Sequence, residues 1–135
     1  RYAIHTLLAR TAHAQRNYLR PYLKEMGLSP GQPKVLEFLL RHGESDQKTI
    51  AAYCEIEPAT VGSILLRMER AGLVVRRQKE GNRRSLFVSL TPKGAQAAGE
   101  MAAVFQQVEG NAVRALSKEE LEHLKILLDR LWKTM

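Results

Sequence analysis

A single β-type segment interrupts a chain whose pattern is otherwise helical, and this combination limits the possible folds most. Residues 73–77 and 86–90 have the composition of strands, and apolar and polar positions alternate in the second run. The polar residues 78–84 connect the two runs, with Gly81 and Asn82 at their centre. We expect one β-hairpin with a basic tip in a mainly α-helical chain.

Helix-start signals divide the remaining sequence. Ser29-Pro30 and Thr91-Pro92 each place a capping hydroxyl before a proline at the first helical position, and Pro58 stands at a similar start. Gln32 can complete a capping box with Ser29, as Glu120 can with Ser117. Helices are expected over about residues 2–26 (bent at Pro21), 30–42, 46–53, 58–71, from 92 with an interruption at 110–111, and from 118.

The net charge of +7 is concentrated in one segment. Residues 58–93 carry +6, whereas residues 1–57 carry +2 and residues 94–135 carry −1. A local basic patch is typical of proteins that bind a polyanion, although an ordinary solvated surface can also be basic. The charge alone does not separate these interpretations.

The order of the expected elements favours binding to a polyanion over an ordinary basic surface. Two helices, a short helix, a further helix and a hairpin form the layout of a winged helix-turn-helix. The helix at 58–71 buries one apolar face, and small or hydroxyl side chains on its other faces could approach DNA bases closely. Arg67 and Arg70 suit phosphate contacts, and the hairpin tip would reach an adjacent groove.

The same residues resemble the MarR family of transcription regulators. The resemblance rests on residues 27–29, 47–51, 58–61 and 67–74, and on the wing at 81–94, in which Asn82 takes the place of the family's usual Asp and Arg84 matches its Arg. It implies a homodimer on pseudo-palindromic double-stranded DNA. The expected DNA-binding residues are Gln47, Lys48, Ala59, Thr60, Gly62, Ser63, Arg67, Lys79, Asn82, Arg83 and Arg84.

The expected architecture is a single domain over residues 1–135. Residues 29–94 form the winged helix-turn-helix lobe, and residues 1–28 and 95–135 supply dimerisation helices. The resemblance also implies a repressor that a small aromatic or phenolic effector releases from DNA. His13, Arg16 and Asn17 are the candidate effector-binding residues.

Other chemistry has little support in the sequence. The histidines are scattered, no catalytic arrangement has a recognisable spacing, and one cysteine without a Cys-x-x-Cys pair argues against structural zinc. We therefore expect no enzyme, no cofactor and no metal site, and we interpret Cys54 as a buried small apolar residue rather than a redox sensor. The single cysteine, the absence of a leader pattern and the absence of a long apolar run indicate a cytoplasmic protein without a membrane span.

One alternative stays open. A winged-helix module can bind a protein partner instead of DNA, and an acidic recognition face would favour that function. The basic segment found here favours DNA.

Overall fold

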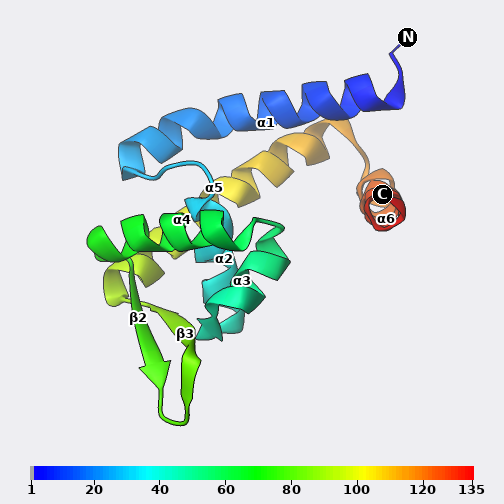
Figure 1. Cartoon of the computed structure of the whole chain (residues 1–135). Helices are drawn as coiled ribbons and strands as arrows, with labels where there is room; N and C mark the ends of the chain where they lie inside the picture. Colours follow the sequence, from blue (N-terminus) through cyan, green and yellow to red (C-terminus); the bar gives the residue numbers. More distant parts are fainter. Residues whose placement is uncertain (1) are drawn as a thin grey trace. The chain divides into compact units, whose positions relative to one another are not determined.

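The computed structural model describes residues 2–135, and the side chains of residues 82 and 83 lie outside that description (Figure 1). The described chain contains six helices and three strands, and the predicted mainly α class with a small β-hairpin is confirmed. In chain order the elements are α1 (Ile4–Met26), α2 (Gln32–His42), β1 (Ser45–Asp46), α3 (Gln47–Cys54), α4 (Pro58–Arg70), β2 (Val74–Lys79), β3 (Asn82–Leu90), α5 (Pro92–Ala115) and α6 (Lys118–Thr134).

The chain divides into two compact units, one ending at Ala102 and one running from Ala103 to Met135. The core of the first unit gathers one apolar face from each of several elements. Its fully buried large side chains are Leu36, Ile50, Leu65, Met68, Met101, Val35, Val61, Val74 and Val88. Apolar residues three and four positions apart make this possible, since they lie on one face of a helix.

The hairpin differs in length from the prediction. The strands pair from Val74 opposite Leu90 out to Lys79 opposite Asn82, so only Glu80 and Gly81 connect them. Residues 78–79 and 82–84, expected in a polar loop, lie in the strands, with a register shift between Gln78 and Lys79. Polar side chains do not prevent pairing here, because the ladder is made by backbone groups. Gly81 has a φ of +81°, which suits glycine in the tight turn.

A third strand was not predicted from the sequence. β1 has two residues, and Ser45 pairs with Val88 while Asp46 pairs with Phe87. The antiparallel sheet therefore has the order β1-β3-β2. It ties the segment before α3 to the base of the hairpin, which Figure 1 shows extending away from α2, α3 and α4.

The start of α2 and the course of α5 differ from expectation. α2 begins at Gln32 rather than at residue 30, because Gly31 takes a φ of +93° at the N-cap. The Gln32 side chain still accepts a hydrogen bond from the Ser29 amide at 3.3 Å, as in a capping box. α5 continues through residues 110–111 without the expected interruption. α1 is one helix that includes Pro21.

α4 ends at Arg70, close to the expected end at residue 71, and a glycine sets this end. Gly72 has a φ of +77°, its amide donates to the Glu69 carbonyl, and the Leu73 amide donates to the Met68 carbonyl at 2.9 Å. This is the left-handed glycine stop of a Schellman motif. It turns the chain directly from α4 into β2.

α1 and α6 each leave several large apolar side chains exposed. Neither α1 nor α6 contains a buried residue. Their exposed large apolar residues are Ile4, Leu7 and Leu8 in α1, and Leu124, Ile126, Leu127, Leu128 and Trp132 in α6. In the described part of the chain, no helix combines the length and apolar character needed to cross a membrane.

Candidate nucleic-acid interface

α4 divides sharply between a buried and an exposed face. Val61, Leu65 and Met68 are completely buried, and they anchor the helix to the core. The residues on the opposite face are all exposed, and they include Ala59, Thr60, Ser63, Arg67 and Arg70. α4 therefore presents short side chains in its first two turns and two arginines in its last two. Such a surface can enter a groove closely while its cations reach phosphates.

The helix before α4, α3, begins with a side-chain cap. The Thr49 amide donates to Asp46 Oδ1 at 2.6 Å, which satisfies one of the free amides at the start of α3. Hydrogen bonds from the Thr49 side chain and amide hold the pKa of Asp46 below its ordinary value. Glu55 ends α3 in the left-handed conformation with a φ of +54°. The two residues between Glu55 and α4 complete the turn of the helix-turn-helix.

Arg76 on β2 connects both helices of this motif. Its Nη1 donates to Gln47 Oε1 at 3.3 Å, and its Nη2 pairs with Glu69 Oε1 at 3.2 Å. The Arg76 side chain is only 16% exposed. One arginine thus links α3, α4 and the wing. The sequence analysis missed it, because nothing in the local pattern distinguishes it from Arg77.

The predicted residues of α3 and α4 lie in three different settings. Lys48 is exposed on α3. Gln47 is half-buried and engaged by Arg76. Gly62 is also half-buried, and a Cβ there would come within 3.3 Å of Gln47 Nε2, so Gly62 allows the two helices to approach.

The wing carries the remaining predicted residues. Arg84 is exposed on β3. The side chains of Asn82 and Arg83 lie outside the described residues. Lys79 does not extend freely, since its Nζ lies 2.7 Å from Glu44 Oε1 and 4.5 Å from the centre of the Phe87 ring.

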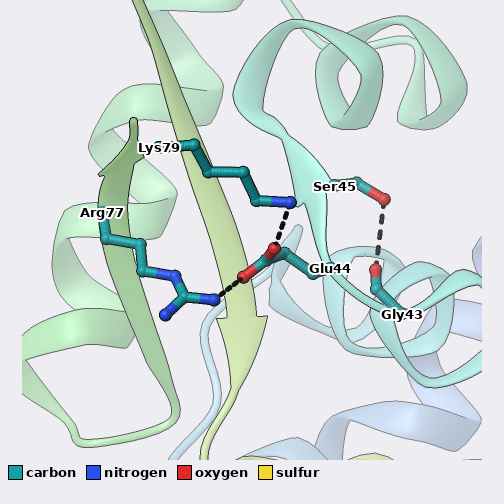
Figure 2. A network of polar contacts seen from close by, with 5 residues as sticks. All are labelled: Gly43, Glu44, Ser45, Arg77 and Lys79. Atoms are coloured by element: carbon teal, nitrogen blue, oxygen red, sulfur yellow. Dashed lines mark hydrogen bonds and ion pairs between the residues drawn. The ribbon is translucent and has the colours of Figure 1, made fainter. Parts of the chain in front are cut away.

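Glu44 also binds a second wing cation. Its Oε2 accepts from Arg77 Nη2 at 3.0 Å, so one carboxylate faces two basic side chains of β2 (Figure 2). The hydrogen bond from Lys79 and the charge and hydrogen bond of Arg77 lower the pKa of Glu44. Glu44 therefore stays ionised at neutral pH. The sequence contains no local signal for this contact, because the paired residues are more than 30 positions apart.

The three candidate effector residues lie within one turn of α1. His13, Arg16 and Asn17 are all exposed, and Asn17 Nδ2 lies 3.1 Å from His13 Nε2. Directly after Asn17, the rings of Tyr18 and Tyr22 lie 5.8 Å apart, and a hydrogen bond with Tyr18 raises the pKa of Tyr22. This pair was not identified from the sequence.

Cys54 is buried at the end of α3, and burial raises the pKa of its thiol. Among the residues that the structure describes, no group of three or more His, Cys, Asp or Glu side chains could hold a metal ion.

Comparison with known proteins identifies the family. The MarR family model matches residues 28–86. The homoprotocatechuate degradative operon repressor of Escherichia coli is 30% identical over 122 residues, which cover 87% of this chain and 81% of the repressor. The HTH-type transcriptional regulator FarR of Neisseria gonorrhoeae is 28% identical over 127 residues, covering 93% of this chain and 86% of FarR.

A solved structure agrees with these relatives. NadR, crystallised in complex with 4-hydroxyphenylacetate, superposes with a TM-score of 0.81 at 27% identity and covers 97% of this chain and 93% of its own. The helix-turn-helix and wing described above are thus the DNA-binding elements expected of such proteins. The chain belongs to the MarR family of winged helix-turn-helix transcription regulators.

Proposed function

We propose that this protein is a homodimeric repressor that binds a pseudo-palindromic operator in double-stranded DNA. The observation that carries the proposal is the exposed face of α4, which places small and hydroxyl side chains beside two arginines and next to a basic wing. Repressor function is supported by the Escherichia coli relative, whose name states that role. Regulation of genomic DNA is consistent with action in the cytoplasm and requires no catalytic step.

Within this function the residues divide between readout and positioning. Ala59, Thr60 and Ser63 would contact base edges, whereas Arg67 and Arg84 would contact phosphates. Gln47, Lys48, Lys79, Asn82 and Arg83 remain predicted contacts, and Gly62 permits the helix packing on which readout depends. The alternative of a protein-binding module is not favoured, because the exposed face is basic.

Dimerisation is proposed from the exposed apolar side chains of α1 and α6. Helices that each leave several large apolar side chains in solvent in the single chain are typical of a protein interface. Residues 1–28 and 95–135 would supply it, and a two-fold dimer would set its recognition helices about 34 Å apart, one turn of DNA. Sedimentation equilibrium should give a dimer mass, and Trp132→Glu should shift the mass toward the monomer.

The proposed effector is a small phenolic acid. One relative is named for the homoprotocatechuate operon and another was crystallised with 4-hydroxyphenylacetate. Arg16 could pair with a carboxylate, and His13 and Asn17 could hydrogen bond a hydroxyl. Addition of 4-hydroxyphenylacetate to the protein–DNA complex should release DNA, and Arg16→Ala should weaken that release without weakening DNA binding in the absence of the effector.

Two substitutions test the assignment of readout and phosphate contacts. Arg84→Ala should weaken binding to every DNA sequence and reduce the slope of log K against log salt by about 1. Thr60→Ala should instead reduce discrimination between operator and unrelated DNA by about 1 kcal/mol, the net contribution of one neutral hydrogen bond. Fluorescence anisotropy with both DNAs over a salt series measures both effects. An unchanged slope in Arg84→Ala would refute the wing contact.

A further inference from the structure

The wing carries its own counter-charge. Glu44 lies in the segment between α2 and β1, and it binds Lys79 at 2.7 Å and Arg77 at 3.0 Å. Figure 2 shows both basic side chains reaching from β2 toward this one carboxylate. Glu44 therefore lowers the combined charge of Arg77 and Lys79 from +2 to +1.

The arrangement leaves the cations accessible while they are paired. The Glu44 side chain is 22% exposed, whereas those of Lys79 and Arg77 are 47% and 65% exposed. The carboxylate therefore binds the cations from the more enclosed side, and their outer surfaces face solvent. An anion arriving from solvent can compete for both of them.

This ion network differs from the other one at the wing base. Arg76 and Glu69 pair beside the core, and the low exposure of Arg76 makes its exchange for an external anion unfavourable. The Glu44 pairs are solvent-accessible, and such pairs contribute little individually. They can therefore be exchanged for DNA phosphates at small cost.

We infer that Glu44 is an internal substitute for a DNA phosphate, which holds Arg77 and Lys79 in the free protein and competes with the DNA backbone for them. The inference rests on the proposed DNA-binding function. It assigns Glu44 a role in setting how strongly the wing binds DNA of any sequence. Weaker sequence-independent binding leaves a larger share of the affinity to the base contacts of α4, since non-specific binding is electrostatic.

The test begins with Glu44→Gln, which keeps the size of the side chain and removes its charge. We expect binding to unrelated duplex DNA about two- to fivefold tighter at low salt, the range that release of an exposed ion pair gives. The slope of log K against log salt should steepen by about 0.9, one phosphate equivalent. Retention on heparin, a polyanion without bases, should increase in parallel.

Glu37→Gln is the matched control. Glu37 pairs with Arg41 on α2 at 3.8 Å, so the substitution makes the same change in net charge away from the wing. A second comparison places Glu44→Gln in an Arg77→Gln/Lys79→Gln background. There its effect should fall to that of Glu37→Gln, because the cations that Glu44 neutralises are gone.

The outcomes are distinct. Weaker DNA binding by Glu44→Gln would overturn the inference, since it would make Glu44 a brace that the bound wing needs. An effect equal to that of Glu37→Gln, or one that persists in the Arg77→Gln/Lys79→Gln background, would also overturn it. Absence of DNA binding by the wild type would instead refute the proposed function, and the heparin comparison would still test the ion network.

A measurement on the wild-type protein covers the case in which Glu44→Gln fails to fold. The carboxyl carbon-13 resonances of Glu44 and Glu37 are followed by NMR while short heparin fragments are added. The Glu44 resonance should move as its two partners leave, and the Glu37 resonance should stay. A Glu44 resonance that does not respond while heparin binds would refute the exchange.

Discussion

Asp46→Ala tests how the helix-turn-helix is held together. Asp46 Oδ1 accepts from the Thr49 amide at 2.6 Å, and it caps a helix of only eight residues. A helix that short depends on its cap and on the burial of Ile50, Ala51 and Cys54. Loss of an N-cap Asp costs about 0.5–2 kcal/mol, and we expect about 1 kcal/mol here because the site is partly solvated.

The pH dependence of this effect has a definite sign. The Thr49 hydrogen bonds lower the pKa of Asp46 in the folded protein relative to its ordinary value of 3.8. The stabilisation is therefore fully present above pH 3.8, and it is lost as the pH falls through the folded-state pKa. The difference in unfolding free energy between wild type and Asp46→Ala should be largest near neutral pH and should shrink in acid.

Urea denaturation followed by circular dichroism at pH 7 and in acid measures both effects, at one fixed protein concentration because a dimer's stability depends on it. Asp46→Ser is the matched control, since a hydroxyl also caps the amide, and it should remain within a few tenths of a kcal/mol of the wild type. An Asp46→Ala protein as stable as the wild type would refute the reasoning. So would an Asp46→Ser protein as unstable as Asp46→Ala.

Two further predictions concern packing. In α5, a Cβ at Gly94 would overlap the Leu73 carbonyl, so Gly94→Ala should lower the unfolding free energy by about 1–3 kcal/mol. A Cβ at Gly99 in the same helix meets open space, so Gly99→Ala should raise the unfolding free energy by up to about 1 kcal/mol. Shifts of the urea midpoint in the same direction for both variants would contradict this. Cys54 is buried with a raised thiol pKa, so iodoacetamide at pH 8 should modify it slowly in the folded protein and quickly in urea. Rapid modification without urea would show that the thiol is accessible.

Local chemistry made part of the fold predictable. The capping box of Ser117 with Glu120 and the end of the fourth helix near residue 71 were expected from the sequence, because each involves residues only a few positions apart. The predicted start of α2, at residue 30, was wrong by two residues. The positive φ of Gly31 determines where α2 begins, and the Ser29-Pro30 signal contains no information about that backbone conformation.

The sheet was predicted less well for a different reason. β1 is two residues long, so it has no alternation to detect, and it exists only because Val88 and Phe87 lie opposite it. The sequence predicts a loop near Lys79, because the side chains at these strand ends are polar. Backbone pairing, which does not depend on side-chain polarity, extends them.

The candidate site shows the same limit. The exposed face of α4 followed from helical periodicity, since the buried positions Val61, Leu65 and Met68 determine which side remains outside. The partners of Lys79 and Arg76 could not be predicted in this way. Those contacts join residues from different elements and depend on tertiary structure.

The central claim is that the protein binds a specific DNA sequence through α4 and the wing. The most direct measurement titrates the purified protein against the DNA upstream of its own gene at two salt concentrations, with excess unrelated DNA as competitor. The account predicts tight binding that survives the competitor and weakens steeply with salt. Absence of binding at low salt would contradict it.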